Sequence, residues 1–230
     1  MSSVNQAAFV PGTTTYKFGD QSIPNIPITG APADTNWRRW AMLWDGSTYR
    51  MYFFKGSTND TIYQFAFNTS TNAYEYGHNS IPILTLTNIP ADADTSSFSM
   101  LWDGSAYRLY VRKLGTPTTL YQAAFVPGST TYQFGYNSIP SLPVTGFPEN
   151  SDWSRWAMLS DGSAYRIYVM QLGSNTALHQ GSYNPAAQAY QYGLNSIPEL
   201  TLVGTPTNSS LASFAMLNDR TNYRFYFQTL

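Results

Sequence analysis

The sequence contains no cysteine, so it can form no disulfide and no thiolate metal site, and it offers no thiol nucleophile. Charge is also scarce, since 11% of the 230 residues are charged and the formal net charge is −1. A chain this neutral lacks the basic surface with which proteins bind nucleic acid or anionic membranes. No apolar run approaches the roughly 18 residues of a membrane span. The N-terminal residues show no signal-peptide pattern, and the compartment stays open.

Aromatic residues, in contrast, make up 16% of the chain. A sequence with few charges and many aromatic side chains has ample apolar surface to bury, which argues against disorder. The length is sufficient for one large domain or two small ones.

A repeat of 58 residues runs through the chain without a gap, and its copies begin at residues 5, 63, 121 and 179. Equivalent glutamines mark its register: Gln6, Gln64, Gln122 and Gln180. An aspartate followed five residues later by an arginine recurs in the same register: Asp45 and Arg50, Asp103 and Arg108, Asp161 and Arg166, Asp219 and Arg224. Repeats of this length are typical of arrays and propellers.

The four copies alternate between two types. The first and third share a Trp-x-Arg-Trp motif, whose tryptophans and arginines are Trp37, Arg39 and Trp40, and Trp153, Arg155 and Trp156. The second and fourth have Phe98 and Phe214 in place of the last tryptophan. A surface site built on features of the first type should therefore occur twice, about a pseudo-twofold axis.

Within each copy, short apolar segments separated by turn residues predict β-strands and no helix. In the first copy these segments are 40–44, 49–54, 62–67 and 73–76, and an Asp-Gly turn joins the first two. The stretch 79–90 carries two prolines and is predicted to be a connection outside the central strands. Each copy is thus a predicted four-stranded antiparallel meander followed by a connection.

The ends of the chain predict closure into a ring. The last copy stops at Leu230 after two strands, and residues 4–9 and 15–18 supply the two strands that it lacks. We therefore predict an all-β fold, a single four-bladed β-propeller of four-stranded antiparallel blades over residues 1–230, closed by the N-terminal strands. The predicted blades are approximately 37–77, 95–135, 153–193, and 211–230 plus 1–19.

The repeat resembles the units of hemopexin-like propellers. The resemblance rests on the Tyr-Phe-Phe-Lys-Gly segment 52–56 and on links ending in Gly-x-Pro at 30–32 and 146–148, and it extends over all four copies. It implies a four-bladed fold and a binding role toward haem, polyamines, a small cation or protein partners. Such units open with Asp-Ala-Ala, which binds ions along the central channel, whereas the triplet here is Trp-Ala-Met at 40–42. Because that acid and the disulfide of the family are missing, a channel metal stays undecided.

Residues found in only one or two copies are free to serve a ligand. Six of them are the candidate ligand-binding residues: Trp37, Arg39, Trp44, Trp102, Trp153 and Arg155. The positions of Trp44 and Trp102 hold Ser160 and Asn218 in the other copies, and burying an unpaired amide costs roughly 1–3 kcal/mol. An exposed indole with polar neighbours suits stacking on a sugar or an aromatic group. The alternative is that the first tryptophan of each motif only covers the end of a blade.

Residues present in all four copies are predicted to serve the blade itself. Tyr16, Tyr49 and Tyr52 lead three fully repeated columns, which we interpret as core between blades. The pair of Asp45 and Arg50 is predicted to lock its hairpin rather than bind a ligand, although four such pairs would also line one face of the disc.

No catalytic constellation is visible. The only histidines, His78 and His179, occupy non-equivalent positions, and no metalloprotease, hydrolase or phosphate-loop motif occurs. Paired carboxylates for glycoside hydrolysis can still meet in space. We predict no enzyme and no cofactor, but a lectin-like carbohydrate-binding propeller with two to four equivalent sites for a glycan or other small ligand. The alternatives are a protein-interaction or toxin-associated module that docks another protein or a second copy, and a hemopexin-like binder of a cation, polyamine or haem.

Overall fold

The computed structural model describes residues 3–21 and 23–229, which contain 20 β-strands. No helix occurs in this part of the chain, and the predicted all-β fold is confirmed. It follows that these residues contain no helix that is long and apolar enough to cross a membrane.

The first complete repeat folds as an antiparallel meander, here called unit 1. Its strands are β4 (Thr35–Trp44), β5 (Tyr49–Lys55), β6 (Thr61–Asn68) and β7 (Ala73–Tyr76). The predicted segments match these strands to within one residue at each end, except that β4 begins five residues earlier than the predicted start at residue 40, beyond an irregularity between Thr35 and Trp40.

Units 2 and 3 repeat this meander. Unit 2 consists of β9 (Ala93–Trp102), β10 (Tyr107–Lys113), β11 (Thr116–Phe125) and β12 (Thr131–Phe134). Unit 3 consists of β14 (Ser151–Ser160), β15 (Tyr165–Gln171), β16 (Ala177–Asn184) and β17 (Ala189–Tyr192).

Unit 4 is assembled from both ends of the chain. Its strands are β19 (Ser209–Asn218), β20 (Tyr223–Thr229), β1 (Ser3–Phe9) and β2 (Thr15–Phe18). Strand β1 pairs with β20 in antiparallel register, with Asn5 opposite Phe227, so the predicted pairing of the two ends is observed. Met1, Ser2 and Leu230 of the predicted last blade lie outside the described residues.

The connections predicted between units lie outside the inner strands, but each contains a further strand that the sequence did not predict. These four linking strands are β3 (Ile26–Thr29), β8 (Ile83–Thr87), β13 (Leu142–Thr145) and β18 (Glu199–Val203). Strand β8 pairs antiparallel with β6 and parallel with β12 of the next unit. The two prolines, Pro82 and Pro90, flank the strand instead of interrupting its hydrogen bonds.

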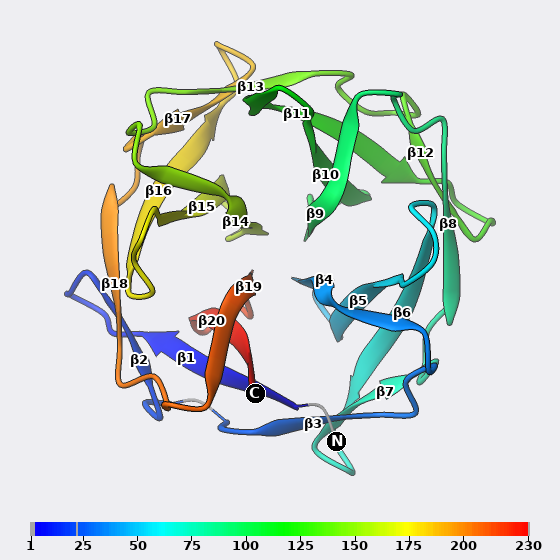
Figure 1. Ribbon diagram of the computed structural model, residues 1–230, viewed down its shortest axis with the longest axis horizontal. Helices are drawn as coiled ribbons and strands as arrows, with labels where there is room; N and C mark the ends of the chain where they lie inside the picture. Colours follow the sequence, from blue (N-terminus) through cyan, green and yellow to red (C-terminus); the bar gives the residue numbers. More distant parts are fainter. Residues whose placement is uncertain (1–2, 22, 230) are drawn as a thin grey trace.

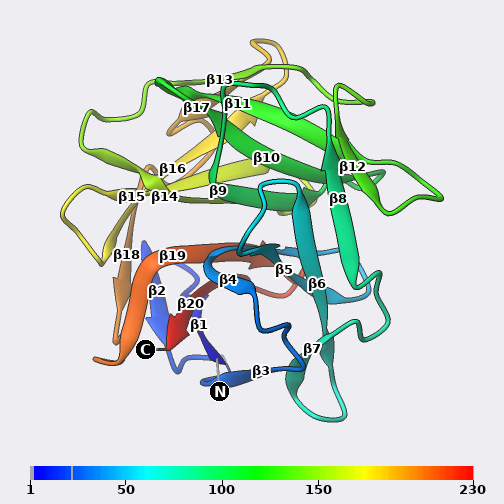
Figure 2. The same cartoon turned by 45° about the vertical axis from the view of Figure 1, so that its right-hand side comes forward.

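Every linking strand joins two neighbouring units in the same way, and the parallel pairs β3–β7, β8–β12, β13–β17 and β18–β2 close a ring. Figure 1 shows β4, β9, β14 and β19 surrounding the centre of this ring, with the linking strands on its outside. Each of the four inner strands lies against the next one around the axis. The turned view in Figure 2 shows the linking strands running along the outer edge from one unit to the next.

The core is divided into four apolar clusters, one at each junction between units. Strand β5 shows why both of its faces are apolar: Met51 and Phe53 pack toward unit 4, whereas Tyr52 and Phe54 pack toward unit 2. These four side chains are at most 1% exposed. Burying large apolar side chains on both faces is the main contribution to the stability of the ring.

Candidate functional site

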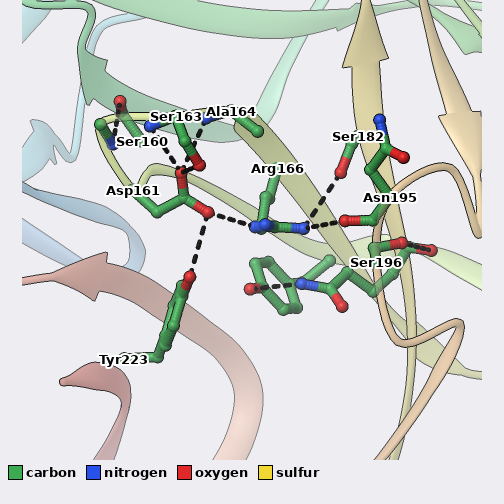
Figure 3. Close-up of polar contacts among 12 residues, drawn as sticks. Ser160, Asp161, Ser163, Ala164, Arg166, Ser182, Asn195, Ser196 and Tyr223 are labelled. Atoms are coloured by element: carbon green, nitrogen blue, oxygen red, sulfur yellow. Dashed lines mark hydrogen bonds and ion pairs between the residues drawn. The ribbon is translucent and has the colours of Figure 1, made fainter.

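The repeated aspartate locks the turn that joins the first two strands of each unit. In unit 3, Asp161 Oδ1 accepts hydrogen bonds from the backbone N–H groups of Ser163 and Ala164, at 2.9 and 2.7 Å. Its Oδ2 lies 2.5 Å from Arg166 Nε (Figure 3). Burial raises the pKa of Asp161, but the hydrogen bonds from Ser163 and Arg166 outweigh burial and lower that pKa to about 2. The carboxylate is therefore held in its charged form.

The repeated arginine extends this lock to the link that follows the fourth strand. Arg166 Nη1 donates to the backbone carbonyl of Asn195 at 2.9 Å and to Ser182 Oγ at 3.2 Å (Figure 3). Asn195 has a φ of 45°, in the left-handed region that asparagine tolerates better than most residues. Across the junction, the Tyr223 hydroxyl donates to Asp161 Oδ2 at 3.0 Å. Arginine–aspartate pairs occur in all four units, which confirms the predicted lock.

Beside each lock lies a cavity between two neighbouring units, here called a junction pocket. The junctions 1–2, 2–3, 3–4 and 4–1 hold cavities of about 300, 430, 400 and 330 Å3. Their lining residues fall in the same columns of the repeat. In junction pocket 3–4 they are Arg166, Tyr168, Gln180, Asn195, Ser196, Ile197 and Leu200 from the unit 3 side, and Phe9, Tyr16 and Tyr223 from unit 4.

Each junction pocket combines aromatic rings with a few fixed polar groups. In junction pocket 3–4, Gln180 Nε2 donates to the Tyr168 hydroxyl at 2.7 Å. In junction pocket 2–3, Gln122 Oε1 accepts from the backbone N–H of Ile139 at 2.9 Å. Burial raises the pKa of Tyr110 in that pocket to about 12, so its hydroxyl is uncharged at neutral pH. The arginine is balanced by its aspartate, and the wall as a whole suits a neutral, polar ligand.

The four junction pockets are similar but not identical. Pocket 2–3 contains Tyr183, whereas Phe9, Phe67 and Phe125 line pockets 3–4, 4–1 and 1–2. In pocket 1–2, Ser80 Oγ is buried without a hydrogen-bond partner among the described residues. A ligand hydroxyl is one group that can satisfy such an oxygen.

The predicted ligand residues Trp37 and Trp153 are half-buried and lie outside the junction pockets. Trp37 packs edge-on against Phe53, with 5.0 Å between ring centroids, and Trp153 packs against Phe147 at 5.2 Å. These contacts agree with the alternative that both indoles cover the end of their unit.

The two arginines of the motif differ in their environment. Arg155 is held by Asp152 at 2.7 Å and by Asn175 at 2.8 Å. Arg39 lies 3.8 Å above the Phe54 ring, and its Nε and Nη2 atoms are buried without a partner among the described residues. Burial lowers the pKa of Arg39. Asn36 takes the position of Asp152 in unit 1, and Arg39 therefore lacks the carboxylate that its counterpart has.

Trp44 and Trp102 line a different cavity, of about 420 Å3, where the four inner strands end. We call it the axial pocket. Each indole packs against a tyrosine of its own hairpin, Trp44 on Tyr49 and Trp102 on Tyr107, both at 4.6 Å between centroids. Trp37 and Trp44 stand near opposite ends of β4, so the six predicted residues do not form one site.

Sequence reasoning missed the junction pockets because the arginine, glutamine and tyrosines that line them are the same in all four copies. Residues common to all copies are predicted to serve the blade, and that prediction includes Tyr52 and, as part of the turn lock, Arg50. One feature of the sequence could have indicated these pockets. An arginine and a glutamine recur in every copy beside tyrosines, and such polar residues are unusual in a core that serves packing alone.

The described residues contain no group of three or more His, Cys, Asp or Glu side chains arranged to hold a metal ion. His78 lies 3.7 Å from Glu75, and His179 lies 3.2 Å from Asn150 in a separate unit. The two histidines are thus not brought together.

No protein-family model and no curated protein matches this chain. Solved structures do match, among them SapL1 lectin in complex with alpha methyl fucoside, at 12% identity and a TM-score of 0.36 over 82% of this chain. AofleA from Arthrobotrys oligospora matches at 14% identity and a TM-score of 0.33 over 83% of this chain. The matches cover 54% and 49% of those chains, so this chain spans about half their length. TM-scores this far below 0.5 assign neither a fold nor a ligand to this chain.

Proposed function

We propose that this chain is a non-catalytic, lectin-like carbohydrate-binding protein, built as a single four-bladed β-propeller in which units 1 to 4 are the blades. The observation that carries the proposal is the repetition of one pocket at all four junctions, with arginine, tyrosine and glutamine in equivalent positions. The junction pockets would be the sugar sites, up to four in number.

The chemistry of these pockets supports a neutral sugar. A pyranose has an apolar face that packs on aromatic and aliphatic side chains, such as Phe9 and Ile197, and a rim of hydroxyls that needs fixed donors and acceptors. Arg166, Gln180 and Ser196 supply polar groups within the same cavity. The arginine is neutralised by Asp161, so a charged ligand would have no unpaired partner there.

The pairing of each repeated aspartate with an arginine also argues against the cation and polyamine ligands of the hemopexin-like alternative. A polyamine or a small cation would need unpaired carboxylates, and the repeated aspartates each pair with an arginine. Four weak sites on one rigid ring would also raise the avidity for a surface that carries many sugars, without any single tight contact.

The test is a glycan array followed by calorimetry with the best neutral monosaccharide. The variant Ile197→Trp fills junction pocket 3–4, and Ile139→Trp fills pocket 2–3. We expect each to remove one site from the binding stoichiometry and the double variant to remove two. Leu172→Trp is the matched control, because Leu172 is 64% exposed and lines none of the four pockets.

Thermal unfolding of each variant checks that the ring is intact. A stoichiometry that stays the same in both folded filling variants would contradict the placement of the sugars. Absence of any response across the array would contradict the carbohydrate function itself.

A further inference from the structure

The axial pocket is a second cavity, formed where the first turn of every unit meets the ring axis. The residues that end the inner strands all line it: Trp44, Trp102, Ser160 and Asn218. Figure 1 shows these inner strands converging on the centre of the ring. The repeat is broken here, because two units present indoles and two present small polar side chains. Such asymmetry is not required by the fold.

Arg220 is the other departure from the repeat in this pocket. The equivalent position is glycine in the other units, Gly46, Gly104 and Gly162, with φ values of 90°, 91° and 84°. Arg220 adopts a φ of 70°, a region that favours glycine and strains other residues. Its guanidinium reaches toward unit 1, where Nη2 lies 3.4 Å from the place of a Cβ on Gly46. The turn of unit 4 is thus strained at Arg220, and the same residue places a positively charged side chain in the axial pocket.

Among the charged residues that line the axial pocket, Arg220 is the one whose charge is not paired with an opposite charge. Asp103 and Asp161 also line it, but Arg108 and Arg166 pair with them at 2.6 and 2.5 Å. Arg220 forms no ion pair with any of the described residues, and only its backbone N–H is bonded, to Asn218 Oδ1 at 2.6 Å. The pocket therefore favours an anion.

Two indoles line the same pocket as Arg220, and they indicate that the anionic group belongs to a ligand with an apolar ring face. Trp44 and Trp102 each pack against a tyrosine of their own hairpin, and both line the cavity. The Nε1 atom of Trp44 is buried without a hydrogen-bond partner among the described residues. Indole faces accept the apolar face of a sugar ring.

We infer that the axial pocket is a binding site for a saccharide that carries a carboxylate, such as a uronic acid. The carboxylate pairs with Arg220, and the sugar ring packs on Trp102 or Trp44. The site is distinct from the junction pockets, although it adjoins two of them through Tyr183 and Asn195. It therefore does not depend on the neutral-sugar proposal.

The experiment is calorimetric titration with D-glucuronate, with D-glucose as the neutral probe of the same ring and acetate as the carboxylate without a ring. We expect glucuronate to bind at a stoichiometry of one per chain and more tightly than either control. Its affinity should fall with added NaCl, since the ion pair with an exposed arginine is screened.

Arg220→Gly is the decisive variant, because it restores the residue of the other three turns and relieves the strained φ. It should unfold at an equal or higher temperature and lose at least tenfold in affinity for glucuronate. Arg220→Lys should retain part of the affinity. Trp102→Ser, which copies Ser160, should weaken glucuronate and leave acetate unchanged.

Unchanged glucuronate binding in folded Arg220→Gly would overturn the inference, and so would binding of acetate as tight as that of glucuronate. Absence of glucuronate binding to the parent protein would overturn it as well. Neutral-sugar binding in the junction pockets is measured separately and should be the same in Arg220→Gly, so the two proposals fail independently.

Discussion

The indole N–H of Trp40 donates a 2.7 Å hydrogen bond to the hydroxyl of Ser213 in the neighbouring unit. Trp156 and Ser97 repeat this bond at 2.8 Å on the opposite side of the ring. Each serine stands where the other type of copy has an arginine, so a tryptophan of one type is paired with a serine of the other. The alternation of copies therefore gives the ring two kinds of junction: junctions 4–1 and 2–3 contain this tryptophan–serine hydrogen bond, and the other two do not contain its equivalent among the described residues.

Replacing Ser213 by alanine should leave the Trp40 N–H buried without its partner and destabilise the protein by roughly 1–3 kcal/mol. Urea unfolding of Ser213→Ala measures this loss. The double variant Trp40→Phe and Ser213→Ala should lose less than the sum of the two single changes, since Trp40→Phe removes the donor. Strictly additive losses would show that the bond contributes nothing.

The lock at Asp161 predicts that acid weakens the fold. Its pKa is lowered to about 2 in the folded protein, against 3.8 ordinarily, so the folded state favours the charged form more than the unfolded state does. Its contribution, on the order of 2 kcal/mol, is present above pH 4 and is lost as the pH falls from 4 to 2.

Stability measured by urea unfolding at pH 6 and at pH 2.5 checks this dependence. Asp161→Asn should be less stable than the parent at pH 6, and the gap between the two proteins should narrow at pH 2.5. A constant gap would contradict the role of the charge. Asp60→Asn is a control on an aspartate that pairs with no arginine among the described residues.

His179 predicts a second pH dependence, at milder acidity. It is 3% exposed and bonds Asn150, whereas Tyr63 and Tyr121 at the equivalent positions bond Asp34 and Asp92. Burial lowers the pKa of His179 below 6.5 in the folded state. The unfolded chain then binds the proton more readily, so stability falls as the pH drops through 6.5.

The double variant His179→Tyr and Asn150→Asp restores the repeated tyrosine–aspartate pair. We expect the loss of stability between pH 7 and pH 5 to become smaller in this variant than in the parent, as measured by thermal unfolding. An identical loss in both proteins would place the titrating group elsewhere.

Because the ring is closed by the pairing of β1 with β20, substitutions that disturb this pairing should strongly lower the stability of the protein. Val4 is fully buried in β1, opposite Gln228 of β20. Val4→Asp would bury an unpaired charge there and should destabilise the protein by roughly 4 kcal/mol or more. Val10→Asp, just beyond β1 and only half-buried, is the control and should cost far less. Equal stability of the two variants would contradict closure through β1.

Much of the fold was predictable because its information is repeated. The 58-residue register, the strand positions and the pairing of β1 with β20 follow from comparing the copies. The linking strands were missed because a strand of four or five residues that contains or adjoins prolines looks like a connection when its partners are unknown. Leu84 and Leu86 of β8 are buried by the neighbouring unit, which the local pattern cannot show.

The candidate sites were predictable only in part, for a physical reason. Whether an indole is covered depends on three-dimensional packing even within one hairpin: Phe53 of β5 covers Trp37 of β4, while Trp44 at the other end of β4 reaches the axial pocket. The junction pockets arise from the spacing between units, which the composition of a single repeat does not encode. Arg166 illustrates this limit, because it serves the turn lock and the pocket wall at once.

The first and last described strands, β1 and β20, pair inside unit 4 and not at any junction between units. All four crossings from one unit to the next are consequently covalent, and β1 and β20 meet as two strands of one sheet. A fragment holding two successive repeats would carry the same complementary ends, so two such fragments can assemble the complete circle.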